Sequence, residues 1–190
     1  MKPRYHYLIK PVGSEYNNTK NIGGVELTVN ATIENAKFVN RIGEVISVPD
    51  ENEELQVGDI VVVHHNVFRT YLDMKGRKRK SNEYFRDENY LVPYNRIYLY
   101  KRDGKWKSIN NYCFVRPIDY VQSSEILRTD KNEEHVGEVV YSNVFLNKSG
   151  IEDGDLIGFT KNSEYEFEIE GEKLYRMQTN DVCLTITEKE

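Results

Sequence analysis

Apolar residues along this chain of 190 residues come in short runs, separated by polar stretches that contain Gly, Pro, Asn and Asp. The runs lie at residues 7–9, 43–48, 59–63, 90–100, 113–115, 137–144, 156–159 and 182–186. β-branched and aromatic residues, which strands favour, are abundant, and the chain has 14 Tyr and 7 Phe. No stretch keeps an apolar period of 3.6 residues over three helical turns. The pattern therefore predicts an all-β protein, either a barrel or a sandwich.

Four short blocks of sequence occur twice in the same order. Residues 7–11, 41–46, 57–61 and 88–97 recur as residues 113–117, 135–140, 153–157 and 172–182. Within the fourth block, the alignment places Tyr90 opposite Leu174 and Leu91 opposite Tyr175. An internal repeat of this kind indicates two domains of similar fold. We expect them at residues 1–105 and 106–190.

A polar stretch interrupts each copy after its first strand. In the first copy it covers residues 12–40 and holds Gly23, Gly24, Val25, Glu26 and Leu27. A polar loop with an apolar tripeptide is typical of a segment that orders on binding. Val25 and Leu27 are two residues apart, so in an extended conformation they would face the same way and could enter one apolar groove.

The corresponding stretch of the second copy is about half as long. It covers residues 120–134 and holds Glu125, Ile126 and Leu127. Ser123 and Ser124 stand where the first copy has its Gly pair. We expect this second loop to reach less far.

The first copy has a second insertion, at residues 64–86, which contains a basic run. We interpret it as a hairpin with arms at residues 69–72 and 83–85 and a Lys-Gly tip. Its candidate contacts to phosphate are Lys75, Arg77, Lys78, Arg79 and Lys80. Such a cluster can bind nucleic acid or an anionic membrane, but basic hairpin tips are more often simply solvated.

Charge divides unevenly between the copies. Residues 1–106 carry 17 Lys and Arg against 14 Asp and Glu, whereas residues 107–190 carry 9 against 17. This asymmetry favours association between oppositely charged faces and gives no indication of nucleic-acid binding for the whole chain. We expect a cytoplasmic protein without a membrane anchor, because no signal peptide or apolar transmembrane run is present.

The two cysteines, Cys113 and Cys183, lie in apolar runs, and we interpret both as reduced core residues. A disulfide between them would require their strands to be adjacent. The chain has no nucleophile elbow, phosphate loop or dinucleotide fingerprint, and His64-His65 has no Cys or His at metal-ligand spacing. We therefore expect no enzyme activity, no cofactor and no metal site.

The order of these motifs resembles the GroES-like co-chaperonin family over nearly all of the first copy. The shared features are a strand ending in Lys-Pro, a long loop with Gly-Gly-Val-Glu-Leu, a Gly-Glu-Val strand, a Val-Gly-Asp-Ile-Val strand, and an acidic turn before Tyr-Leu. The resemblance implies two tandem GroES-like β-barrel domains. A tandem chain is similar to the double-headed co-chaperonins of chloroplasts, and a phage-encoded co-chaperonin is another context.

The resemblance also implies a function. Such a protein forms a ring of identical chains, caps a GroEL-type chaperonin ring in its ATP-bound state and assists protein folding. The implied contacts to the chaperonin are Gly23, Gly24, Val25, Glu26 and Leu27, and in the second copy Glu125, Ile126 and Leu127. Glu26 departs from the family, which has an aliphatic residue there. The alternatives are a structural or assembly protein, of the virion type, that reuses the fold, and, less favoured, a nucleic-acid-binding β-barrel.

Overall fold

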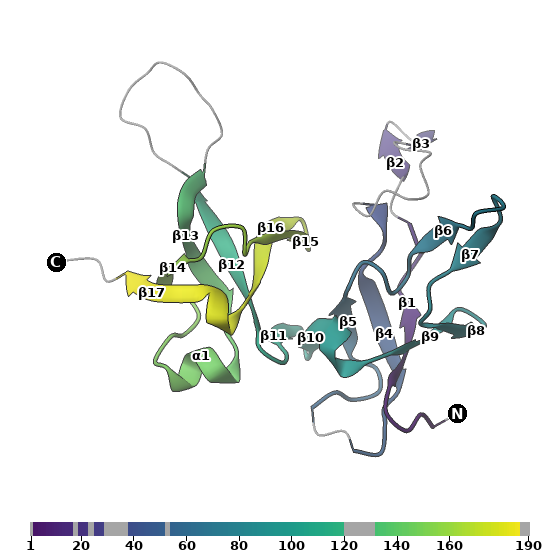
Figure 1. Ribbon diagram of the computed structural model, residues 1–190, viewed down its shortest axis with the longest axis horizontal. Coiled ribbons are helices and arrows are strands. Elements are labelled where there is room, and N and C mark those ends of the chain that lie inside the picture. Colours follow the sequence, from purple (N-terminus) through teal and green to yellow (C-terminus); the bar gives the residue numbers. More distant parts are fainter. Residues whose placement is uncertain are drawn as a thin grey trace. The chain divides into compact units, whose positions relative to one another are not determined.

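The computed structural model describes residues 2–16, 19–22, 25–28, 38–51, 54–119 and 132–186. The chain forms two compact units, Met1–Lys105 and Trp106–Glu190 (Figure 1). Strands make up most of the regular structure in both units, which confirms the prediction of an all-β protein. Each unit has one large open sheet.

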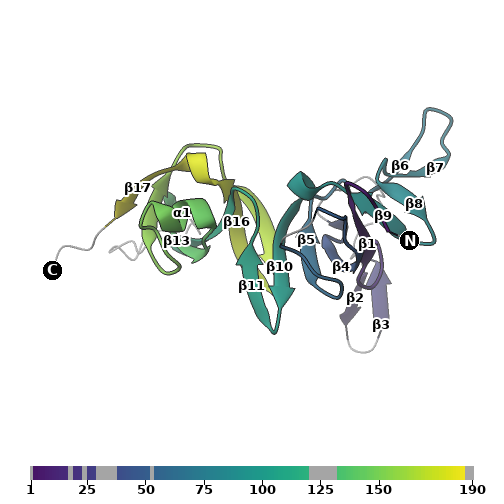
Figure 2. The same ribbon diagram turned by 90° about the horizontal axis from the view of Figure 1, so that it is seen from below.

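The large sheet of the first unit runs in the order β10-β5-β4-β1-β9-β8, and β11, which begins at the last residue of this unit, continues it beyond β10. Their bounds are β1 Tyr7–Pro11, β4 Ile42–Ser47, β5 Ile60–Val63, β8 Tyr84–Arg86, β9 Asn89–Val92, β10 Ile97–Arg102 and β11 Lys105–Ser108. Two small sheets accompany it, β2 (Thr19–Ile22) with β3 (Val25–Thr28), and β6 (Thr70–Leu72) with β7 (Lys78–Lys80). A short 3₁₀ helix, η2 (Tyr94–Arg96), precedes β10. Figure 2 shows the β6–β7 hairpin standing out from the first unit beside β8.

The second unit has a six-stranded sheet in the order β15-β16-β12-β13-β14-β17. Its strands are β12 Tyr112–Asp119, β13 Asn132–Tyr141, β14 Leu156–Phe159, β15 Tyr165–Ile169, β16 Glu172–Gln178 and β17 Val182–Ile186. A short helix, α1 (Val144–Lys148), connects β13 to β14, and a 3₁₀ helix, η3 (Thr179–Asp181), connects β16 to β17.

The two sheets share one strand order. In the first unit β8, β9, β1, β4, β5 and β10 follow one another, and in the second β15, β16, β12, β13, β14 and β17 do so. The registers agree as well, because Pro11 pairs with Gly43 and Pro117 pairs with Gly137. The pairing register of each first strand also shifts at the same place. The shift lies between Leu8 and Ile9 in β1 and between Phe114 and Val115 in β12.

The register corrects the alignment of the fourth block. Ile9 pairs with Tyr90, and its counterpart Val115 pairs with Tyr175. Tyr90 therefore corresponds to Tyr175 and not, as the sequence alignment has it, to Leu174. The difference arises because β16 covers Glu172 to Tyr175 between its turn and this pair, whereas β9 covers only Asn89 and Tyr90.

A Gly-Asp turn leads into the third strand of each sheet. Gly58 and Gly154 have φ values of +92° and +97°, which favour glycine. The Asp59 carboxylate accepts a hydrogen bond from Gln56 N at 2.7 Å, and Asp155 accepts one from Glu152 N at 2.8 Å. Glycine thus supplies the left-handed backbone conformation and aspartate the acceptor in both turns.

Asp59 has a further partner that sequence reasoning missed. Arg102 donates from Nε to Asp59 Oδ1 at 2.9 Å and from Nη2 to Asp59 Oδ2 at 2.6 Å. The same Nη2 donates to the backbone oxygen of Glu54 at 2.8 Å. Asp59 is 4% exposed, so this two-point contact supplies the buried carboxylate with the partner that it needs.

Each unit packs its own core beneath its sheet. In the first unit the fully buried residues include Ile9, Val45, Val61, Tyr90 and Leu99, and in the second Cys113, Val115, Val139, Ile157 and Met177. Phe68 packs edge-on against Tyr90, with ring centroids 4.9 Å apart. The alternation of buried and exposed residues along β4 is that of a strand with one buried face.

Helix α1 was not predicted, because residues 137–144 read as one apolar strand. β13 instead ends at Tyr141, and Asn143 caps the helix. Asn143 Oδ1 accepts from Phe145 N at 2.9 Å and from Leu146 N at 3.0 Å, and its Nδ2 donates to Tyr112 O at 2.8 Å. Asparagine is a preferred residue at this position. Leu146 is the apolar residue that the helix buries.

The cysteines differ from each other. Cys113 is fully buried, and burial raises the pKa of its thiol to about 12. Cys183 is exposed, so the expectation that both are core residues is wrong for Cys183. It lies on β17, which forms the edge of the sheet, and β13 and β14 separate that strand from β12. Both thiols are free.

Candidate functional site

The predicted docking residues lie in and next to β3. Val25, Glu26 and Leu27 belong to this strand, and their backbone pairs with Ile22, Asn21 and Lys20 of β2. Gly23 and Gly24, which connect the two strands, lie outside the described residues. Glu125, Ile126 and Leu127 of the second copy also lie outside them.

The two ends of the stretch that carries β2 and β3 are tied together. We call residues 14–16 and 39–40 the loop root. Tyr16 forms a β-bridge with Val39, and Asn40 N donates to Glu15 O at 2.9 Å. Asn40 is 2% exposed, and its Nδ2 donates to Val12 O and Ser14 O, both at 2.8 Å. Its Oδ1 accepts from Ile42 N at 2.8 Å, so the whole amide group of Asn40 holds the root closed.

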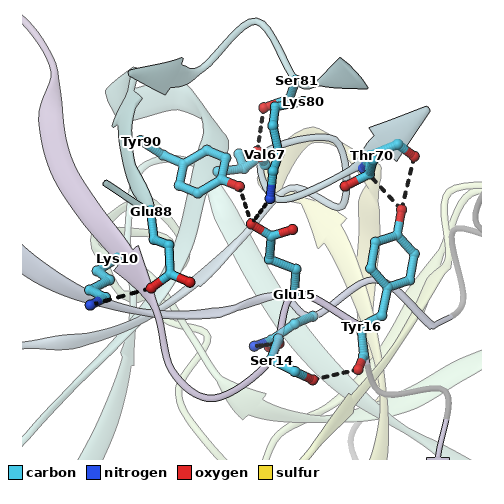
Figure 3. A network of polar contacts seen from close by, with 11 residues as sticks. Lys10, Ser14, Glu15, Tyr16, Val67, Thr70, Lys80, Ser81, Glu88 and Tyr90 are labelled. Carbon is cyan, nitrogen blue, oxygen red and sulfur yellow. Dashed lines mark hydrogen bonds and ion pairs between the residues drawn. The ribbon is translucent and has the colours of Figure 1, made fainter. Parts of the chain in front are cut away.

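The β6–β7 hairpin contacts this root directly (Figure 3). The Tyr16 hydroxyl donates to Thr70 O and accepts from Thr70 N, both at 2.9 Å. Lys80 forms an ion pair with Glu15. Tyr90 donates its hydroxyl to the same Glu15 Oε1 at 2.8 Å. Burial, followed by this hydrogen bond, raises the pKa of Tyr90, so its hydroxyl stays protonated and remains a donor.

The hairpin that carries the basic run differs from the prediction in one arm. Thr70–Leu72 pairs with Lys78–Lys80, and the Lys75-Gly76 tip is confirmed. The predicted second arm at residues 83–85 is wrong, because Tyr84 belongs to β8 and pairs with Tyr90 of the large sheet. The basic residues themselves therefore form the second arm. The sequence did not reveal this, because a run of Lys and Arg has no strand preference.

Most of the basic side chains have carboxylate partners within the first unit. Arg77 Nε lies 3.0 Å and Arg79 Nε 3.2 Å from Asp73 Oδ2. Hydrogen bonds from the backbone of Arg77 and Lys75, together with those from the two guanidinium groups, lower the pKa of Asp73. Lys80 is paired with Glu15. Among the described residues, Lys75 and Lys78 have no carboxylate within ion-pair distance, so two of the five predicted phosphate contacts carry an uncompensated charge.

The structure also pairs the Lys or Arg that precedes each proline. Arg116 Nη1 lies 2.7 Å from Glu138 Oε2, and its Nε lies 2.5 Å from Glu172 Oε1. Lys10 lies opposite Glu44 in the strand register, and its Nζ lies 3.5 Å from Glu88 Oε2. These side chains are at least one-third exposed, so the pairs contribute little to stability.

The described part of the chain offers no group of three or more His, Cys, Asp or Glu that could hold a metal ion. His64 stacks on His65 with ring centroids 4.1 Å apart, and its Nδ1 accepts from Asn66 N at 3.0 Å. Within the same residues, no helix has the length and apolar character needed to cross a membrane.

No family model matches this chain, and no curated protein matches it.

Proposed function

We propose that this protein is a co-chaperonin that caps a chaperonin ring. In this proposal both units are GroES-like β-barrel domains. The β2–β3 hairpin docks on the ring, and the chain assembles with identical copies. The observation that carries the proposal is the shared strand order of the two sheets, in which the same four sequence blocks take the same places. The register shift common to β1 and β12 supports a barrel, because bulges increase the bend and twist of a strand.

Docking would use the backbone and apolar side chains of β3. Val25 and Leu27 would enter an apolar groove on the ATP-bound ring, with Glu26 between them. Full burial of two such side chains contributes about 3–6 kcal/mol, much of it offset by the cost of association and ordering. One loop therefore binds weakly. A ring of several chains binds tightly because the loops act together.

The protein would contribute no chemistry of its own. It would bind the ATP-loaded ring, close the cavity over a non-native client and leave after hydrolysis. The second loop, with Glu125, Ile126 and Leu127, would contribute less, since it lacks the Gly pair and is shorter.

A structural role in an assembly, of the virion type, is the second candidate. Glu26 favours it, because a carboxylate in the docking tripeptide opposes burial in an apolar groove. The third candidate, nucleic-acid binding, is disfavoured because Arg77, Arg79 and Lys80 are already paired with carboxylates.

The test is to mix the purified protein with a bacterial-type chaperonin, with and without ATP, and to analyse the mixture on a sizing column. Migration with the ring in ATP only, together with a change in the ATPase rate, supports the proposal. Failure to migrate both with this ring and with the chaperonin ring of the natural host rejects the proposal and favours the structural role.

A further inference from the structure

The β6–β7 hairpin is attached to the loop root by two separate contacts. Thr70, the first residue of β6, is completely buried, and both its backbone N–H and C=O bond to the Tyr16 hydroxyl. Lys80, the last residue of β7, pairs with Glu15. Since Thr70 and Lys80 are paired residues of the two strands, both contacts fix the same end of the hairpin.

The carboxylate of Glu15 is the centre of this attachment. Its side chain is 17% exposed, and its Oε1 receives both Lys80 and the hydroxyl of the buried Tyr90. Tyr90 is completely buried, lies on β9 and pairs with Ile9 of β1 within the large sheet. Glu15 thereby connects the hairpin to the core of the first unit, as the close-up in Figure 3 shows.

The two units differ in a way that links the hairpin to the loop. The first copy has both the long stretch at residues 12–40 and the hairpin between β5 and β8. The second copy has a stretch of about half that length, and only residues 160–164 connect β14 to β15. The hairpin and the long loop therefore occur together, and where the loop is short no such hairpin is present.

We propose that the β6–β7 hairpin is a brace that positions the β2–β3 hairpin for docking, and that Glu15 and Tyr16 are the positioning residues. This inference rests on the proposed function only for the identity of the partner. A root held by Glu15 and Tyr16 restricts the directions in which the chain can run from Tyr16 toward β2. Such restriction lowers the ordering cost of docking and so strengthens it.

The first test is hydrogen–deuterium exchange on the free protein, which needs no partner. Glu15→Gln and Lys80→Met each remove one side of the ion pair, and Lys78→Met is the matched control on the same strand. We expect both single variants to speed exchange of backbone amides in the root and in β6–β7. Exchange in the double variant should be no faster than in either single variant, because both substitutions remove the same Glu15–Lys80 ion pair. Lys78→Met should exchange as the wild type does.

Tyr16→Phe tests the second contact. It keeps the ring and removes only the hydroxyl, so it should loosen Thr70 without unfolding the unit. Two results would overturn the proposal that the hairpin braces the root. One is that these variants speed exchange in β6–β7 but not in the root, and the other is that the effects of Glu15→Gln and Lys80→Met add up.

The second test is the affinity for a chaperonin ring in ATP. We expect Lys80→Met to weaken binding by about three- to ten-fold, with the unfolding midpoint of the unit nearly unchanged, and Lys78→Met to bind as the wild type does. Equal binding by Lys80→Met and wild type would refute the positioning role. If the wild type itself does not bind, the proposed function fails, and the exchange data alone decide whether the hairpin holds the root.

Discussion

Gly137 occupies the place in the second sheet that Gly43 occupies in the first. Gly43 lies opposite Pro11, and Gly137 lies opposite Pro117. A Cβ at residue 43 would come within 2.9 Å of Phe68 Cζ and 3.1 Å of Lys10 O, and one at residue 137 would overlap Val115 Cγ1 and come within 2.8 Å of Arg116 O. Both sites require the absence of a side chain, because backbone and core atoms fill the space.

The first prediction follows from this close approach. Gly43→Ala and Gly137→Ala should each lower the free energy of unfolding of their own unit by about 1–3 kcal/mol, because overpacking displaces buried atoms. Gly158→Ala is the control, since the nearest atoms that its Cβ would meet belong to the side chain of Leu184, which is exposed and can move. Urea denaturation measures all three. A loss for Gly158→Ala as large as for the other two would contradict the steric explanation.

The two turn aspartates should differ in their contribution to stability. Asp155 Oδ2 receives the Glu152 amide, whereas Asp59 receives the Gln56 amide and, in addition, two bonds from Arg102. We expect Asp155→Ala to cost about 1 kcal/mol, and Asp59→Ala about 2–4 kcal/mol, because it leaves Arg102 without its charged partner. Denaturation midpoints of the two variants test this. Equal losses would show that the Arg102 contact adds nothing.

The two thiols should react at very different rates. Burial raises the pKa of Cys113 to about 12, so at pH 8 almost none of it is thiolate, and no reagent reaches it. Cys183 is exposed. A thiol-reactive dye should therefore label one site per folded chain and a second only in denaturant. Cys183→Ser should abolish the fast labelling, and persistence of that phase would show that Cys113 is accessible.

The hairpin tip should respond to acid through Asp73. Hydrogen bonds from the backbone and from Arg77 and Arg79 lower the pKa of Asp73 below the ordinary aspartate value of about 3.9. Its contribution to hairpin order is therefore complete above that ordinary value and is lost as the pH falls through the lowered pKa. The amide shifts of Lys75 and Arg77 should titrate with a midpoint below 3.9. Asp73→Asn should remove this titration, and a midpoint at or above the ordinary value would exclude the charged network.

The sequence carried most of the information on the strands, because short apolar runs rich in β-branched and aromatic residues, and the Gly, Pro, Asn and Asp that bound them, are local features. It could not show what depends on contacts between distant residues. Arg102 lies 43 residues from Asp59, and Lys80 lies 65 residues from Glu15. Helix α1 was missed because five residues are too few for a helical period, although the capping Asn143 was visible. The docking residues were identified from the tripeptide within a polar loop and from the resemblance.

The most direct test of the co-chaperonin proposal compares three proteins for binding to a chaperonin ring in ATP. They are the wild type, Val25→Ser with Leu27→Ser, and the control Leu72→Ser with Met74→Ser, which removes two exposed apolar side chains from the β6–β7 hairpin. The proposal predicts that the wild type and the control migrate with the ring. It predicts that the β3 variant loses at least about ten-fold in affinity while its unfolding transition is unchanged. Binding of the β3 variant equal to that of the wild type, or no binding by the folded wild type, would contradict it.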